Sequence, residues 1–295
     1  MSSPSGTRLW VAGARPRTLP AALVPVAVGA GCATGVPGVA WWRVILAAVV
    51  SLSLQVGVNY ANDYSDGVRG TDTERVGPLR LVGSGLVEPS RVKRAAAMSL
   101  LLACLAGAVL ALVTTLWLVV VGLAAVLAAW FYTGGPRPYG YAGLGELFVF
   151  VFFGLVATVG TTYVLCTALP ARSWWAGSAA GCLSCALLVV NNLRDIPGDT
   201  VSGKRTLAVR LGDRRTRVLF IVLFAATAAF VAATAVVTGP STMLGLLGVL
   251  AAAPAIRGVL GGARGPALIA VLGAVGRAQL VFGATCAVGI ALSLA

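Results

Sequence analysis

Long apolar runs separated by short polar segments make up almost the whole chain. A membrane-spanning helix needs about 20 predominantly apolar residues, and nine runs approach that length. They are Leu19–Gly38, Trp41–Tyr60, Arg94–Val113, Thr115–Tyr132, Gly145–Leu165, Trp174–Leu193, Val218–Val237, Thr242–Leu260 and Ala267–Leu294. The pattern predicts an all-α, polytopic membrane protein with about nine transmembrane helices.

The connections between these runs alternate in character. Every second connection is a turn of a few residues, and the others are longer and more polar. This alternation predicts a single bundle over residues 1–295, built from helical hairpins, with its working loops on one side. We expect a polar N-terminal tail at residues 1–18 and active-site loops at residues 61–93 and 194–217.

The composition excludes a soluble domain. Hydrophobic residues make up 58% of the chain and charged residues 11%, whereas soluble domains carry about 25% charged residues. The net charge of +13 does not indicate nucleic acid as a partner, because the basic residues lie in short loops without interleaved aromatic residues. The expected surroundings are a lipid bilayer, and the sequence does not indicate an oligomeric state.

The basic residues also predict the orientation. Nearly all of the 22 lysine and arginine residues fall on the side that carries the N-terminus and the longer loops. The opposite side has only Arg43 and Arg172, and Arg277 lies inside the last apolar run. By the positive-inside rule, the N-terminus and the longer loops are cytoplasmic and the C-terminus lies outside, in the plasma or inner membrane.

Two polar clusters follow directly on apolar runs. The first is N-Y-A-N-D-Y-S-D-G-V-R-G-T-D-T-E-R-V-G-P-L-R at residues 59–80, which holds four of the nine acidic residues of the protein. The second is N-N-L-R-D-I-P-G-D at residues 191–199. Ionisable groups beside an apolar run indicate function, so we expect the two clusters to face each other across one site.

The spacing within each cluster predicts a column of oxygen ligands, because residues three, four or seven apart share a face of a helix. The first column is Asn59, Asn62 or Asp63, and Asp66. The second column is Asn192, Asp195 and Asp199, with Asn191 four residues before Asp195. Mg²⁺ prefers oxygen ligands and binds through one or two carboxylates together with substrate phosphates. The clusters therefore predict a shared magnesium site that takes a phosphate or diphosphate.

Basic residues next to both clusters suit that ligand. Arg75 and Arg80 follow the first cluster, and Arg194 and Lys204 accompany the second. Such groups bind phosphate oxygens and stabilise the charge of a leaving group. Arg137 is a further candidate for substrate binding, although a basic residue at the charged membrane face also serves as an orientation signal.

At these residues the sequence resembles the UbiA superfamily of intramembrane prenyltransferases. The resemblance is carried by the segment 59–80, by Y-T-G-G-P at 132–136, by G-L-G-E-L at 143–147 and by N-N-L-R-D-I-P-G-D-T-V-S-G-K-R-T-L-A-V-R-L-G at 191–212, with A-R-P-R-T-L-P at 14–20. The N-D-Y-x-D-G-x-x-G-T-D form, followed by R-x-G-P-x-R, is typical of the branch that prenylates 1,4-dihydroxy-2-naphthoate in menaquinone synthesis.

The resemblance implies two Mg²⁺ ions that grip the diphosphate of a polyprenyl donor. The implied ligands are Asn59, Asp63 and either Asp66 or Asp72 for one ion, and Asn192, Asp195 and Asp199 for the other. The expected substrate-binding residues are Asn59, Asn62, Arg75, Arg80, Arg137, Asn191, Asn192, Arg194 and Lys204. The expected catalytic residues are Asp63, Asp66, Asp72, Asp195, Asp199 and Tyr132.

The implied reaction joins an allylic carbon of the donor to the naphthoate ring, which loses CO₂ and a proton. The chain has no histidine, so Tyr132, Asp72 and substrate-assisted loss of CO₂ remain alternatives for the proton acceptor. Two other functions stay open. One is a prenyltransferase of the same superfamily with a different aromatic acceptor, and the other is a cation or metabolite transporter, which would also carry carboxylates on its helices.

Overall fold

The structure is a computed structural model that describes residues 6–70 and 79–294, and all regular elements among them are helical. The first half contains α1 (Thr7–Ala14), η1 (Pro16–Thr18), α2 (Pro20–Ala33), α3 (Arg43–Val68), α4 (Pro89–Val113), α5 (Trp117–Phe131) and η2 (Tyr139–Ala142). The second half contains α6 (Gly145–Val149), the π-helical η3 (Phe150–Val156), α7 (Ala157–Cys166), α8 (Ala171–Val201), α9 (Leu207–Thr238), η4 (Pro240–Gly245), α10 (Leu246–Ala251), α11 (Ala253–Leu260) and α12 (Ala267–Leu294). The predicted all-α class is confirmed.

Seven helical segments in the described part of the chain are long and apolar enough to cross a membrane. They are α3, α4, α8, α9 and α12 together with the composite segments Gly145–Cys166 and Pro240–Leu260. The helices α2 and α5 are apolar but shorter. A multi-pass membrane protein is therefore confirmed, and the count of nine crossings stays a prediction.

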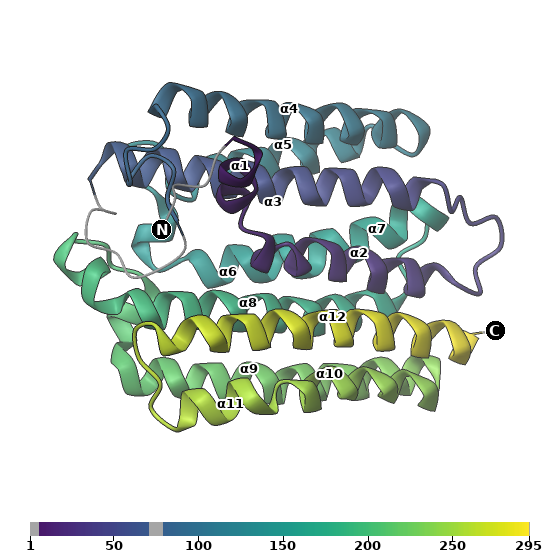
Figure 1. Ribbon diagram of the computed structural model, residues 1–295. Helices are drawn as coiled ribbons and strands as arrows, with labels where there is room; N and C mark the ends of the chain where they lie inside the picture. The colour runs from purple at the N-terminus through teal and green to yellow at the C-terminus, as the bar shows by residue number, and fades with distance from the viewer. Residues whose placement is uncertain (1–5, 71–78, 295) are drawn as a thin grey trace.

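The long helices lie side by side in one bundle (Figure 1). In that view α4 and α5 lie at the top, α9 to α11 lie at the bottom, and α8 and α12 lie between them and the N-terminal helices. The turn from α8 to α9 is at the left end of the bundle, and the C-terminus is at the right end. The short helix α1 packs against α3.

Close helix packing depends on glycine where η3 meets α8. A Cβ atom added to Gly154 would lie 2.5 Å from the Cα atom of Gly181 and 2.8 Å from the carbonyl oxygen of Gly177. Small residues let membrane helices approach in this way without a hydrophobic driving force. This contact holds the π-helical segment against α8, which is the most completely buried of the membrane-spanning candidates.

Arg43 and Arg172, the two arginines predicted on the opposite side of the membrane, connect neighbouring helices in the structure. Arg43 donates to the carbonyl oxygens of Val113 and Val164, each at 2.9 Å. Arg172 donates to the carbonyl oxygen of Cys32 at 2.8 Å. Carbonyl groups at helix C-termini have no partner within their own helix, so these two side chains tie together the ends of α2, α4 and α7.

The polar clusters extend helices that we expected to end earlier. The structure continues α3 past Tyr60 to Val68 and α8 past Leu193 to Val201. The expected loops 61–93 and 194–217 are correspondingly shorter, because α4 begins at Pro89 and α9 at Leu207. The expected tail 1–18 contains α1 and η1. The polar residues keep helical backbone hydrogen bonds and find partners for their side chains across the bundle.

Candidate active site

One large cavity of about 880 Å³ runs inside the bundle. Its polar end is lined by Asp66, Asp199 and Lys204, and its remainder lies among apolar side chains of α3, α4, α5, η3 and α7. Along α3 the lining residues extend from Ala47 to Asp66, which is roughly 28 Å at 1.5 Å per residue. The cavity therefore joins a charged head region to an apolar channel about as long as the membrane core is thick.

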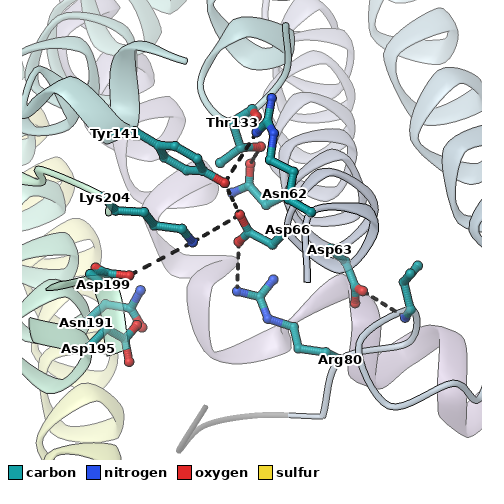
Figure 2. Close-up of polar contacts among 12 residues, drawn as sticks. Asn62, Asp63, Asp66, Arg80, Thr133, Tyr141, Asn191, Asp195, Asp199 and Lys204 are labelled. Carbon is teal, nitrogen blue, oxygen red and sulfur yellow. Dashed lines mark hydrogen bonds and ion pairs between the residues drawn. The ribbon is translucent and has the colours of Figure 1, made fainter. Parts of the chain in front are cut away.

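Asp66 is the centre of the charged region. Its Oδ1 atom accepts a hydrogen bond from Lys204 Nζ at 3.1 Å and another from the Tyr141 hydroxyl, and Arg80 Nη2 lies 3.6 Å from Oδ2. Figure 2 shows Asp66 between Arg80 and Lys204. Asp66 is only 3% exposed, and burial removes most of the hydration of its carboxylate. The surrounding donors compensate for that loss.

Lys204 joins the two predicted clusters. Its Nζ atom lies 3.1 Å from Asp66 on α3 and 3.9 Å from Asp199 on α8 (Figure 2). The same ammonium group lies 4.7 Å from the centre of the Tyr141 ring, which is a cation–π distance. The structure thus brings the two clusters together at one end of the cavity, as their sequences predict.

Asp63 points away from this centre. Its Oδ2 and Oδ1 atoms accept hydrogen bonds from the backbone N–H groups of Leu81 and Val82 at 2.8 and 3.0 Å. Figure 2 shows the Asp63 side chain turned away from Asp66, with one of these bonds drawn. The side chain is fully buried and does not line the cavity. In this structure Asp63 therefore holds the segment that follows Arg80, and its predicted role as a metal ligand stays a prediction.

Asn59 lines the cavity but uses its amide for other contacts. Its Nδ2 atom donates to the carbonyl oxygen of Ala14 and to Thr18 Oγ1, and its Oδ1 atom accepts from Gln55 Nε2. These bonds attach the turn between α1 and α2 to α3. Asn59 therefore positions the N-terminal segment over the cavity.

The second cluster lies on the last turns of α8. Arg194 binds Asp195 through two parallel hydrogen bonds of 2.8 and 2.9 Å, and its Nη2 atom also donates to Asn191 Oδ1 at 2.8 Å. Asn192 donates from Nδ2 to Glu146 Oε1 at 3.0 Å. Asn191, Asn192, Arg194 and Asp195 all line the cavity.

Three other predicted residues do not join this arrangement. Asp72 and Arg75 lie outside the described residues. Arg137 is exposed and does not line the cavity. Tyr132 does line it. The predicted catalytic role of Tyr132 stays a prediction.

Several residues of the site were not predicted as site residues. Tyr141 is one of them, because its hydroxyl donates to Asp66. Arg69 donates to the carbonyl oxygens of Thr133 and Gly135, and the Thr133 hydroxyl donates to Asn62 Oδ1 at 2.7 Å. The glycines of Y-T-G-G-P were a signal for a tight turn, but the sequence did not reveal that this turn packs on α3.

Oxygen donors at the head of the cavity fit a hard divalent cation. Among residues 6–70 and 79–294, no group of three or more His, Cys, Asp or Glu side chains is close enough to hold one ion. The donors instead face the cavity from two sides: Asp66 on α3, and Asn192, Asp195 and Asp199 on α8. Mg²⁺ is bound by one or two carboxylates when substrate phosphates supply further ligands, and this donor set suits that mode.

The fold and the site define a helical membrane protein in which a long apolar cavity ends in carboxylates and cations. The chain belongs to the UbiA prenyltransferase family, whose pattern it matches over residues 22–267.

Two mycobacterial proteins are similar to this chain over most of their lengths. It is 51% identical over 277 residues to the 1,4-dihydroxy-2-naphthoate octaprenyltransferase of Mycobacterium tuberculosis, covering 92% of this chain and 93% of that protein. It is 48% identical to the Mycobacterium leprae protein of the same name, covering 97% and 96%.

The fold also resembles a solved structure. A UbiA homologue from Archaeoglobus fulgidus bound to DMAPP and Mg²⁺ superposes with a TM-score of 0.62 at 19% identity, covering 96% of this chain and 99% of that one. At this identity the likeness supports the fold alone.

Proposed function

We propose that the protein transfers a polyprenyl group from a polyprenyl diphosphate to 1,4-dihydroxy-2-naphthoate. CO₂ and diphosphate are released, and the product is demethylmenaquinol in menaquinone biosynthesis. The names of the mycobacterial relatives support this acceptor. The observation that carries the proposal is one continuous cavity that combines a charged head with an apolar channel. An amphiphile with an anionic head and a long hydrocarbon tail matches both ends at once.

The basic residues at the head of the cavity bind the donor diphosphate in this proposal. Arg80, Arg194 and Lys204 are buried and line the cavity, so water does not screen their charge strongly. When the bond between the allylic carbon and the diphosphate oxygen breaks, negative charge grows on the leaving group. Cations that are already in place stabilise this charge without further reorganisation.

The proposed magnesium-holding residues are Asp66 on α3 and Asn192, Asp195 and Asp199 on α8. Two ions are expected, and Asn59, Asp63 and Asp72 remain predicted ligands of the first. When bound, Mg²⁺ adds positive charge at the leaving diphosphate. These residues would hold the metal and the diphosphate at the polar end of the cavity, and the donor tail would lie along α3 toward Ala47.

The aromatic acceptor meets the allylic carbon where the polar and apolar parts of the cavity join. Tyr132 lines this cavity, and a phenol carries its proton at neutral pH. It therefore serves as a hydrogen-bond donor that orients the acceptor. The ring carbon that carries the carboxylate forms the new C–C bond, and the electrons of the breaking C–CO₂ bond restore the aromatic ring.

The polar end of the cavity is placed on the cytoplasmic side of the cell membrane in this proposal. The distribution of lysine and arginine along the sequence supports that orientation. The N-terminus then lies in the cytoplasm, and the C-terminus, at the opposite end of the bundle in Figure 1, lies outside.

A diphosphate-release assay tests the function. Purified protein in detergent receives geranylgeranyl diphosphate and Mg²⁺, with and without 1,4-dihydroxy-2-naphthoate. We expect release that requires both Mg²⁺ and the naphthoate, is abolished by EDTA, and yields a prenylated, decarboxylated product. Asp195→Ala should abolish turnover in a protein that remains folded. Donor binding without turnover would refute the acceptor, and the absence of any donor binding would favour a transporter.

A further inference from the structure

Glu146 lies in the first turn of α6 and reaches the second polar cluster. Its Oε1 atom accepts the 3.0 Å hydrogen bond from Asn192 Nδ2. Its Oε2 atom is buried and has no hydrogen-bond partner in the part of the chain that the structure describes. A buried carboxylate without full compensation is unfavourable, so an apolar residue would pack here at lower cost. The presence of Glu146 therefore points to a role that needs a side-chain oxygen at this position.

The contact between α6 and α8 holds Glu146 in place. Cys185 Sγ lies 3.1 Å from the Glu146 carbonyl oxygen, and a Cβ atom at Gly145 would lie 3.4 Å from the Leu188 side chain. Cys185, Leu188 and Asn192 are three, four and seven residues apart and so share one face of α8. This face therefore carries Asn192 next to Glu146, and the Cys185 contact together with the close approach at Gly145 holds α6 against α8.

The partner of an asparagine decides which end of its amide remains available. A carboxylate only accepts hydrogen bonds and a guanidinium only donates them. Glu146 therefore takes the NH₂ group of Asn192, and Arg194 takes the oxygen of Asn191. Both asparagines line the cavity. Asn192 keeps its oxygen for a ligand, whereas Asn191 keeps its NH₂ group.

We propose that Glu146 is a positioning residue that turns the Asn192 Oδ1 atom toward the cavity. There this oxygen completes the ligand set for the divalent cation that accompanies the donor diphosphate. The inference rests on the proposed function for the identity of the ligand. It assigns Glu146 the role of a hydrogen-bond acceptor, and its charge is not required.

Three variants separate this role from a role in proton transfer or packing. Glu146→Gln keeps an acceptor oxygen and loses the charge. Glu146→Leu loses the acceptor at similar volume, and Asn192→Ala removes the group that Glu146 orients. The probe is geranylgeranyl S-thiolodiphosphate, which does not react, and its binding to the full-length protein in detergent is measured by calorimetry over a series of Mg²⁺ concentrations without any aromatic acceptor.

We expect Glu146→Gln to stay within about threefold of the parent protein. Glu146→Leu should weaken Mg²⁺-dependent binding by about 10- to 100-fold, as is usual when the partner of a metal ligand is lost. The double variant with Asn192→Ala should bind no worse than Asn192→Ala alone, because residues that act through one another are not additive. In turnover assays, the loss of rate in Glu146→Leu should become smaller as the Mg²⁺ concentration is raised. The value of kcat at saturating Mg²⁺ should change less than the apparent affinity for Mg²⁺.

Exchanging the carboxylate and the amide between positions 146 and 192 protects the test against variants that fail to fold. Asn192→Asp places a second carboxylate beside Glu146 and should bind poorly. Adding Glu146→Gln should restore binding, because the glutamine can donate to the new carboxylate. No rescue, additive losses, or a Glu146→Gln protein as weak as Glu146→Leu would overturn the inference. Because no acceptor is present, failure of naphthoate turnover would leave this result interpretable.

Discussion

Asp63→Asn separates two roles for a residue that the sequence predicts as a metal ligand. In the structure both carboxylate oxygens of Asp63 accept backbone N–H groups, from Leu81 and Val82. An asparagine offers one acceptor oxygen and one NH₂ group at almost the same volume. One of the two N–H groups then faces another donor, and the segment that follows Arg80 loses one of its two backbone hydrogen bonds to the Asp63 carboxylate.

The size of the effect follows from these contacts. Asp63 and Leu81 are both fully buried, so water does not replace the lost bond. A hydrogen bond to a charged group is worth about 1.5–3 kcal/mol, and 1.4 kcal/mol corresponds to a factor of ten. The open form of the segment should therefore become roughly 10- to 140-fold more populated.

Hydrogen–deuterium exchange of the backbone amides measures this opening directly. Peptides that cover residues 79–88 should exchange faster by the same factor in Asp63→Asn, since local exchange reports the free energy of opening. Asp199→Asn is the matched control, because Asp199 lies in the cavity and makes no contact with Leu81 or Val82 among those described. If exchange in Asp63→Asn is unchanged while the affinity of the variant for Mg²⁺ falls, Asp63 binds metal and the anchoring role is incorrect.

Three further substitutions test the site and the packing around it. Tyr141→Phe removes the hydroxyl that donates to Asp66 and should lower kcat/KM roughly tenfold, for about 1.5 kcal/mol. Burial and Asp66 raise the pKa of Tyr141, so the phenol stays protonated. The dependence of kcat/KM on pH from about pH 6 to 9 should therefore have the same shape in the variant as in the parent protein, and a change in its alkaline side would contradict this. Lys204→Met removes the cation between the clusters and should reduce kcat/KM by about 10²- to 10³-fold, and a loss below threefold would argue against diphosphate binding by Lys204. Gly154→Ala places a Cβ atom 2.5 Å from the α8 backbone and should destabilise by about 1–3 kcal/mol in thermal denaturation, whereas Gly160→Ala, with nothing within 4 Å, should not; equal melting temperatures would show that η3 can move away.

The membrane fold was predictable because apolar runs of helical length are a strong signal. The ends of α3 and α8 were not, because hydropathy falls at Tyr60 and Leu193 while both helices continue. An apolar run marks the part of a helix that meets lipid or core. It does not mark the part whose polar side chains are paired across the bundle, as Asp66 is with Lys204.

Residue spacing identified the clusters but could not sort their members. At about 100° per residue, Asp63 lies roughly 60° around α3 from Asp66, at the edge of the polar stripe. Asp66 therefore points into the cavity, whereas Asp63 points toward the segment after Arg80. Tyr141 and Arg69 could not be found from spacing at all, because their contacts with Asp66 and Thr133 cross 75 and 64 residues of sequence.

In the proposed function, the pairing of charges at the head of the cavity couples the binding of the metal to the binding of the diphosphate. Each cavity carboxylate has a basic neighbour: Arg80 and Lys204 beside Asp66, Arg194 beside Asp195, and Lys204 beside Asp199. A diphosphate that draws these cations to itself leaves the buried carboxylates less compensated, which is unfavourable in a poorly hydrated site. The carboxylates of Asp66, Asp195 and Asp199 would then hold a divalent cation, which would supply the missing positive charge on their side. Each ligand therefore raises the affinity for the other by the same factor, and the cations that hold the ligand-free site together become the groups that receive the leaving diphosphate.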